Sequence, residues 1–252
     1  MESDRTAFDR LDIYRKVKIV EGEKFVTIED TKSLGEDEMV EFVTHFIDDL
    51  AFEDVPSVNV LVNNRFSEKV ERMLKEKSFQ LHDEVVMVRK QLDDMLSGAD
   101  DLTFSLRSLH ELPLEEFISV WKKSAANSPN ASSVLNMDEQ MQNVRKELGP
   151  GYQDTCLVAY DGGKPVGVVM PHIEPGTLDE GRLFYFGLVP EERGKRKSKV
   201  LHQQALRVLK EDFGASYYIG STSTANIPML KTFKENGCSV IERDRVYTRK
   251  RS

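Results

Sequence analysis

Five of the seven residues from 193 to 199 are lysine or arginine, and this basic loop is the part of the chain best suited to hold an anion. It follows an apolar run, 183–189, that reads as a strand closed by Pro190, which cannot donate to a sheet. Apolar residues at helical spacing come after it. A helix N-terminus offers backbone N–H groups, and Gly194 permits close approach. This context favours a phosphate-binding loop over the alternative, a solvated basic turn.

The composition restricts what the anion could be. The 252 residues carry a formal net charge of −8, which argues against general affinity for nucleic acids or anionic membranes. The basic loop is therefore a local exception that suits a small anionic ligand. Cys156 and Cys238 form no CxxC pair and lack metal-ligand spacing, so we expect neither a disulfide nor a metal. The polar start and the lack of a membrane-length apolar run predict a soluble, cytoplasmic protein.

Strands and helices alternate around the basic loop. The turn 161–164 (DGGK) predicts a hairpin, and the strand 217–222 leads to a helix that opens at Asn226 and ends at Gly237. In front of the hairpin the pattern predicts a strand over 102–109 and helices over 113–126 and 138–148.

The first half contains a shorter version of this order. An offset of 160 residues (64 to 224) aligns 64–90 with 224–250 without a gap, each copy reading as a helix and two strands. Identities are few, so coincidence is the alternative. Only Gly35 precedes the acidic start of the first half's earlier helix, so no phosphate loop is expected there. The acidic segment 92–101 predicts a linker between the halves.

Two segments of the second half resemble the GNAT superfamily of N-acetyltransferases. The segment 187–206 (GLVPEERGKRKSKVLHQQAL) resembles the family signature at 193–198. In that signature an arginine or glutamine is followed by two residues, a glycine, one residue, and a glycine or alanine. The segment 217–238 (YYIGSTSTANIPMLKTFKENGC) carries the asparagine that opens a helix and the glycine that ends it. The resemblance extends over about 102–250, and more weakly over the latter half of the first repeat.

The resemblance implies an α/β (α+β) fold with two GNAT-like mixed, twisted sheets flanked by helices, the N-terminal one incomplete. It implies a degenerate domain at 1–95 without a cofactor loop and a catalytic domain at 101–252. Acetyl-CoA would lie between two parallel strands that separate, 183–189 and 217–222. The residues implied to bind it are Leu188, Val189, Arg193, Gly194, Lys195, Arg196, Lys197, Ser198, Lys199, Asn226 and Phe233.

Two departures from the family pattern bear on the chemistry. Arg196 and Ser198 stand where glycine or alanine is usual, so we expect a less open but usable loop, with the Arg196 side chain pointing outward. Phe233 stands where many members carry a tyrosine that protonates the departing thiolate. Because phenylalanine has no proton to give, either backbone dipoles or a hydroxyl from 221–224 would assist the thiolate instead.

Acetyl transfer to an amine needs a polarised thioester carbonyl and a neutral amine. The resemblance implies that a backbone N–H of Leu188 or Val189 polarises the carbonyl. Tyr185 is the candidate catalytic side chain on the same strand, with a pocket wall as the alternative. Trp121 is expected in the acceptor pocket or the core, and His202 at the surface or behind the site. Further candidate bases precede the strand: His172, Glu174, Asp179 and Glu180.

The resulting hypothesis is an enzyme that transfers the acetyl group of acetyl-CoA to a primary amine of a small molecule or protein, by direct attack in a ternary complex. Phe233 and Arg196 motivate an alternative, a catalytically weak acyl-CoA-binding protein. A polyanion binder that uses the basic loop is disfavoured by the net charge of −8. We expect an amine acceptor as partner, no nucleic acid and no membrane, and the assembly state, monomer or homodimer, is open.

Overall fold

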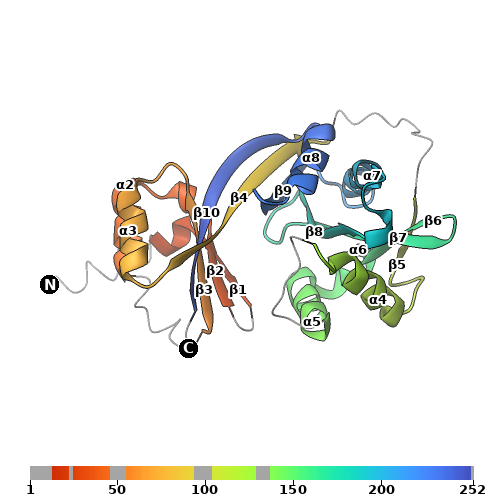
Figure 1. Cartoon of the computed structure of the whole chain (residues 1–252), viewed down its shortest axis with the longest axis horizontal. Coiled ribbons are helices and arrows are strands. Elements are labelled where there is room, and N and C mark those ends of the chain that lie inside the picture. The colour runs from red at the N-terminus through yellow and green to blue at the C-terminus, as the bar shows by residue number, and fades with distance from the viewer. Residues whose placement is uncertain (1–12, 23–24, 46–54, 94–103, 129–136, 251–252) are drawn as a thin grey trace. The chain divides into compact units, whose positions relative to one another are not determined.

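The computed structural model describes residues 13–22, 25–45, 55–93, 104–128 and 137–250. Their strands form one mixed sheet in the order β1-β2-β3-β10-β4-β9-β8-β7-β6-β5 (Figure 1). The expectation of two separate sheets was therefore wrong. In this order β10 (Ser239–Lys250) and β4 (Gln80–Gln91), each 12 residues long, are neighbours. Neither contains glycine or proline, so each stays extended where the sequence predicted two shorter strands.

The chain forms two compact units. Unit 1 comprises Met1–Val86 and Glu242–Ser252, and unit 2 comprises Met87–Ile241. The last strand thus begins in unit 2 and ends in unit 1. The linker predicted over 92–101 lies mostly outside the described residues. A division of function between domains at 1–95 and 101–252 stays a prediction.

Unit 1 has its helices on one side of its strands (Figure 1). In it, β1 is antiparallel to β2, β2 is parallel to β3, and β3 is antiparallel to β10. The strands β2 and β3 bury every second residue, as a sheet with one covered face does. Phe42 and Leu74 cover that face. The elements of the unit are β1 Lys18–Glu21, β2 Phe25–Glu29, η1 Thr31–Ser33, α2 Glu36–His45, β3 Ser57–Asn63 and α3 Glu68–Glu76.

Unit 2 has helices on both faces. The strands β5 to β8 are antiparallel neighbours, and α7 connects β8 to the parallel strand β9. The helices α4 and α5 lie on one side of these strands and α7 on the other (Figure 1). Phe117 belongs to the core cluster with residues of α4 and α5, and Leu201 to the cluster with residues of α7. The elements are β5 Ser105–Ser108, α4 Leu114–Ala125, α5 Met137–Leu148, η4 Gly149–Gly151, α6 Tyr152–Thr155, β6 Leu157–Asp161, β7 Lys164–Ile173, β8 Glu180–Leu188, η5 Pro190–Glu192, α7 Lys197–Glu211, β9 Tyr217–Ser223 and α8 Ile227–Glu235.

Among the described residues, six successive elements occur twice in the same order: a strand, a 3-10 helix, a helix, a strand, a helix and a long strand. The copies are β2-η1-α2-β3-α3-β4 and β8-η5-α7-β9-α8-β10. Matching elements are offset by about 160 residues (57 to 217 for β3 and β9). The sequence predicted this repeat only from residue 64 onward, and the structure extends it back to β2.

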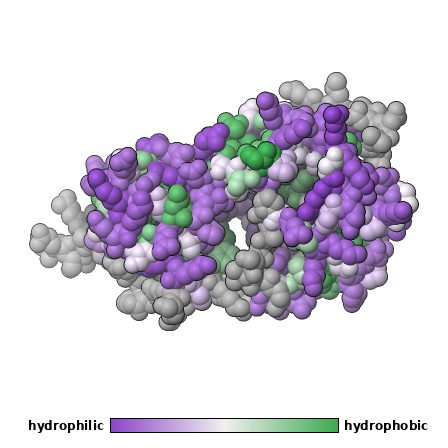
Figure 2. Space-filling view, viewed as in Figure 1, coloured by the Kyte–Doolittle hydropathy of each residue, from purple (hydrophilic) through white to green (hydrophobic). Residues whose placement is uncertain are grey.

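The surface is mostly hydrophilic, as Figure 2 shows for one face. This agrees with a composition of 31% charged residues. Among the described helices, none is long and apolar enough to cross a membrane.

Candidate functional site

The parallel strands β8 and β9 pair only where they begin. Glu180 lies opposite Tyr217 and Gly181 opposite Tyr218, and no register is formed beyond these two positions. Both strands continue, β8 as far as Leu188, so they separate toward their carboxyl ends. A separated pair of strands leaves backbone edges that an extended ligand can pair with, in the manner of an added strand. This is the opening that the resemblance implied.

A bulge in β8 sets which side chains face each side of the opening. Val169 pairs with Phe186 but Pro171 pairs with Leu183, so β8 has one more residue than β7 across this step. Phe184 and Tyr185 accordingly both pack on the α4 side, whereas Leu183 and Phe186 pack on the α7 side. A bulge of this kind re-aims side chains and interrupts pairing.

The opening leads directly to the N-terminus of α7. The Val189 N–H donates to Val166 O (3.0 Å) and ends the pairing of β8. After η5 the basic loop enters α7, whose first turn has no acidic residue and whose N-cap residue makes no side-chain capping bond. The first N–H groups of a helix have no intrahelical acceptor and lie at the positive end of its dipole. This terminus therefore suits an anion.

Two residues of the basic loop have left-handed backbone conformations. Gly194 has φ +74°, and a Cβ placed on it would meet nothing within 4 Å. Arg196, the N-cap of α7, has φ 61°, although it stands where the family signature has glycine. A side chain in this conformation costs roughly 1 kcal/mol. The Arg196 side chain is exposed, as expected.

Arg193 ties the loop to α4 rather than lying open to a ligand. Its guanidinium donates from Nε to Leu188 O (3.1 Å) and from Nη2 to Ser124 O (3.0 Å) and Ala126 O (2.9 Å). Its backbone N–H donates to Pro190 O (3.2 Å). Because these donors already have acceptors in the protein, Arg193 holds the end of β8 and the end of α4 together.

Two lysines of the loop, Lys195 and Lys197, are paired with carboxylates. Lys197 Nζ lies 2.8 Å from Asp161 Oδ2 and 2.6 Å from Glu192 Oε2, and Lys195 Nζ lies 3.3 Å from Glu192 Oε1. These contacts raise the pKa of Lys197, with the hydrogen bond to Asp161 as the main cause. The hydrogen bond from Lys197 lowers the pKa of Glu192. An anionic ligand would share these cations with Glu192 and Asp161.

The loop and α8 are joined through side chains and backbone. The Ser198 and Thr232 hydroxyls lie 3.2 Å apart, and Asn236 Nδ2 donates to Lys199 O (3.1 Å). Asn226 caps α8 as predicted, because its Oδ1 accepts from the Met229 N–H (3.3 Å). Its Nδ2 donates to Thr222 Oγ1 (3.0 Å). A bond from Asn226 to the pantetheine arm stays a prediction.

Phe233 lies in an aromatic cluster beneath the opening. It is buried, and its ring centroid lies 5.6 Å from that of His202 and 6.3 Å from that of Tyr218. Of the two positions expected for His202, the surface position was wrong, because this side chain is completely buried, whereas a position behind the site is compatible with that burial. Burial and the charge of Lys90 lower its pKa to about 3. Sequence reasoning could have placed it inside, since it lies four residues before Leu206 on the apolar side of α7.

Tyr185 is poorly suited to act as a base. Burial raises the pKa of its hydroxyl, so the phenol stays neutral near pH 7. Its ring packs against Trp121 (5.6 Å between centroids), which is itself buried in the α4-side core. The Oη atom lies above Gly187, where a Cβ would be only 2.5 Å away. Gly187 therefore makes room for the tyrosine, which lines the α4 side of the opening.

Three of the other candidate bases come together at the start of β8. Arg182 Nε lies 3.2 Å from Glu174 Oε2 and 2.7 Å from Glu180 Oε1. His172 Nε2 lies 3.8 Å from Glu174 Oε2, and His172 and Glu174 are both buried. Asp179 contributes its carbonyl oxygen to the Ser216 N–H (3.0 Å). In the described part of the chain, no three His, Cys, Asp or Glu side chains are arranged so that they could hold a metal ion together.

The matching family model is described as the acetyltransferase (GNAT) family and spans residues 107–238, just over half of the chain. The chain belongs to the GNAT acetyltransferase family. Solved GNAT structures also resemble it across both units. A GCN5-related N-acetyltransferase from Sphaerobacter thermophilus is 13% identical to this chain, with a TM-score of 0.61. The match covers 93% of this chain and 76% of that protein. A tandem GNAT protein of the clavulanic acid biosynthesis pathway is 13% identical with a TM-score of 0.59, covering 93% of this chain and 78% of its own.

A glucosamine N-acetyltransferase region of a fungal β-N-acetylglucosaminidase is 12% identical with a TM-score of 0.60, covering 92% of this chain and 31% of its own. At these identities the similarity shows the fold alone. No curated protein sequence matches the chain. The family is thus established by the C-terminal half, and the tandem GNAT-like fold by the whole chain.

The corresponding strands of unit 1 have no GNAT opening. β2 and β3 pair at four consecutive positions, from Phe25 with Ser57 to Ile28 with Val60. Beyond β2, Thr31 Oγ1 donates to Leu61 O (2.6 Å) and accepts from the Asn63 N–H (3.3 Å). These two bonds close the strand ends at the place where β8 and β9 separate.

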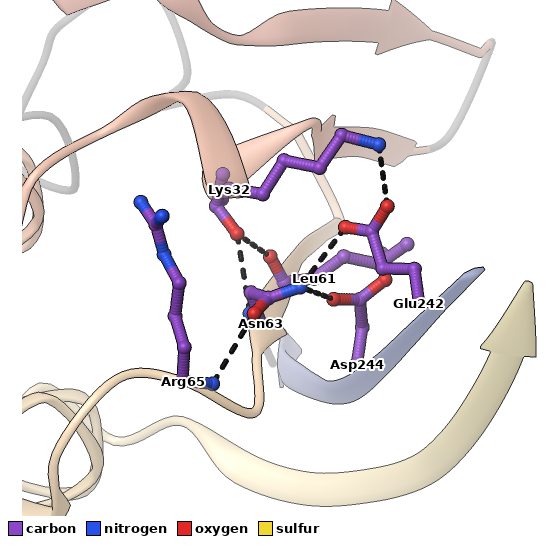
Figure 3. Close-up of polar contacts among 7 residues, drawn as sticks. Lys32, Leu61, Asn63, Arg65, Glu242 and Asp244 are labelled. Carbon is purple, nitrogen blue, oxygen red and sulfur yellow. Dashed lines mark hydrogen bonds and ion pairs between the residues drawn. The ribbon is translucent and has the colours of Figure 1, made fainter.

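A polar network continues from this closure to β10 (Figure 3). Asn63 Nδ2 donates to Glu242 Oε1 and Asp244 Oδ1, both at 3.0 Å, and Lys32 Nζ lies 2.5 Å from Glu242 Oε2. Glu242 and Asp244 are buried. Burial and the neighbouring Glu242 carboxylate raise the pKa of Asp244 to about 6. The network therefore fixes β10 beside β3 but leaves two carboxylates close together.

The helix N-terminus in unit 1 is already occupied by the chain's own acids. The first turn of α2 contains Glu36, Asp37 and Glu38. The Gly35 N–H donates to Glu38 Oε2 (2.7 Å), and the Ser67 hydroxyl donates to Glu36. A pyrophosphate at this terminus would meet three carboxylates, whereas the terminus of α7 has none.

Replacing Asp244 with asparagine is expected to stabilise the protein at neutral pH. Because the folded-state pKa is about 6, above the ordinary 3.8, the charged aspartate weakens the fold as pH rises between these values. Asparagine keeps an oxygen for Asn63 and removes the charge. We expect a gain of up to about 3 kcal/mol in unfolding free energy at pH 7.5 and little change at pH 4. Urea unfolding at both pH values tests this, and a gain independent of pH would contradict it.

Proposed function

We propose that the protein is an acetyl-CoA-dependent N-acetyltransferase whose site lies in the C-terminal half, and that the acceptor is a primary amine of a small molecule or protein. One observation carries the proposal: β8 and β9 separate after Gly181, and the opening leads to the uncapped, acid-free N-terminus of α7. The edges of the strands suit the extended pantetheine arm, and the helix terminus suits the pyrophosphate. Family membership supports the same reaction class.

The residues at the opening have distinct expected roles. Backbone N–H groups from Gly194 to Lys199 hold the pyrophosphate, with Lys195, Arg196 and Lys197 adding positive charge. Arg193 keeps the loop in place through its carbonyl contacts. Asn226 binds the arm, and Phe233 forms the wall beneath it. Bound acetyl-CoA supplies an acetyl group already activated as a thioester.

The resemblance implied that the N–H of Leu188 or of Val189 polarises the thioester carbonyl. The Val189 N–H already donates to Val166 O (3.0 Å), so the N–H of Leu188 takes this role. Holding both reactants in one ternary complex supplies most of the acceleration, about 7–11 kcal/mol in favourable cases. The acceptor ammonium loses its proton before attack, and Tyr185, whose phenol stays neutral, is a poor acceptor for it. The group of His172, Glu174 and Glu180 lies at the other end of β8 from Leu188, roughly 25 Å along the strand, so it does not take this proton directly.

The alternative, a catalytically weak acyl-CoA-binding protein, rests on Phe233. This side chain is buried and packed against His202, and it offers no hydroxyl to the departing thiolate. A protein of this kind would bind acetyl-CoA without transferring its acetyl group.

Release of free thiol from acetyl-CoA distinguishes the two functions. The intact protein is incubated with acetyl-CoA and, in turn, tyramine, spermidine, a lysine-containing peptide and a peptide with a free N-terminus. An N-acetyltransferase releases thiol faster with at least one amine class than without amine, and mass spectrometry finds the acetylated amine. Tight binding of acetyl-CoA together with a release rate that no amine increases would favour the binding protein.

A further inference from the structure

His202 lies between the two strands that form the opening. Its ring centroid is 5.5 Å from that of Phe186 on β8, 5.3 Å from that of Tyr218 on β9, and 5.6 Å from that of Phe233 on α8. The Tyr218 ring reaches along β9 over Gly220, where a Cβ would lie only 2.3 Å from the tyrosine oxygen. The imidazole is thus the polar group enclosed by the aromatic rings beneath the point where β8 and β9 separate.

Asn236 determines which nitrogen of His202 carries the proton. Its Nδ2 donates to Lys199 O (3.1 Å), a carbonyl that can only accept, and this fixes the orientation of the amide. The same Nδ2 lies 3.1 Å from His202 Nδ1. An amide nitrogen has only hydrogens to offer, so Nδ1 accepts and the proton of the neutral imidazole is on Nε2.

The Nε2–H of His202 is a buried donor without an acceptor in the described part of the protein. Nε2 is the ring nitrogen that does not contact Asn236, and the rings of Phe186, Tyr218 and Phe233 enclose the imidazole. A buried donor left without a partner is unfavourable, and most such groups in native proteins have one. Because the pKa of His202 is lowered to about 3, the ring stays neutral and keeps this single N–H at physiological pH.

We propose that the Nε2–H of His202 donates a hydrogen bond to the pantetheine arm of acetyl-CoA, to an oxygen or sulfur of the arm between β8 and β9. This rests on the proposed function, because it needs the arm to lie in that opening. His202 would then bind and orient the arm near Phe233, a position where the wall has no hydroxyl. No proton is transferred, since the neutral imidazole acts only as a hydrogen-bond donor.

The test compares two ligands that differ only in the arm. Calorimetric titration measures the Kd of acetyl-CoA and of adenosine 3′-phosphate 5′-diphosphate, which keeps the phosphates but lacks the arm. The variants are His202→Phe, which keeps an aromatic ring without the donor, and His202→Gln, which places an amide N–H near the position of Nε2. Thermal unfolding of each variant shows whether the fold is kept.

For His202→Phe we expect acetyl-CoA to bind about three- to tenfold more weakly and the arm-free ligand to bind as before. His202→Gln should recover most of the lost affinity. Unchanged acetyl-CoA binding in a folded His202→Phe, or an equal loss for both ligands, would overturn the inference. If the unmodified protein binds neither ligand, the proposed function itself fails, and that result is distinct from the other two.

Discussion

Replacing Gly194 with aspartate is expected to weaken acetyl-CoA binding by about 100-fold or more. The new carboxylate would stand within a few ångströms of the pyrophosphate, where like charges near a protein surface repel by about 4 kcal/mol at 4 Å. A hundredfold change in Kd needs about 2.7 kcal/mol. The fold should tolerate the substitution, because a Cβ at Gly194 meets nothing within 4 Å. The φ of +74° adds strain, which is mild for aspartate.

Gly214→Asp is the matched control for this experiment. Gly214 has φ +72° and open space around its Cβ position, so it takes the same side chain with the same strain. Gly214 lies just after the C-terminus of α7, whereas the basic loop lies at its N-terminus. A 15-residue helix separates the two by about 20 Å. Titration should give wild-type affinity for Gly214→Asp. Equal affinity in the two variants would show that the N-terminus of α7 does not hold the cofactor.

Arg193→Ala is expected to lower the unfolding free energy by about 2–3 kcal/mol. The guanidinium joins Leu188 O at the end of β8 to Ser124 O and Ala126 O at the end of α4. Removing one hydrogen bond to a charged group lowers the unfolding free energy by about 1.5–3 kcal/mol. Arg193 makes several such bonds, but it is partly exposed to solvent, so its total effect is smaller than their sum. Arg193→Lys should recover less than half of this loss, because one ammonium group does not match the four carbonyls, Asn127 O included, that surround the planar guanidinium.

Arg196→Ala provides the comparison for this effect. Arg196 is an exposed cation three residues away, and its removal should change the unfolding free energy by no more than about 0.5 kcal/mol. Urea denaturation of the three variants beside the unmodified protein gives the measurement. A variant lacking Arg193 that is as stable as the parent would mean that these carbonyl contacts are replaced by water at no net loss.

Local signals in the sequence predicted the loop, the helix cap and the hairpin turn of the C-terminal half. The basic loop, the capping Asn226 and the glycine-rich turn each depend on the conformation of a few neighbouring residues, and the structure has each of them as predicted. Arg196, which stands where the signature has glycine, has a left-handed conformation. The family followed from the spacing of these local features.

Long-range pairing was not accessible in the same way. Nothing local in the sequence of β4 or β10 says which strand lies beside it, so the single sheet was missed. The closure of β2 against β3 depends on Thr31 and Asn63, which lie 32 residues apart and look like ordinary loop residues. His202 was expected at the surface or behind the site, and the sequence could not decide between them because its burial comes from rings on three other elements.

The central claim is that one half of this tandem GNAT protein binds acetyl-CoA and the other does not. The most direct measurement is the stoichiometry of acetyl-CoA binding to the full chain by calorimetric titration. We expect one molecule per chain, because β8 and β9 are separated while β2 and β3 are paired and the N-terminus of α2 is acidic. Two molecules per chain, or no binding, would contradict this account.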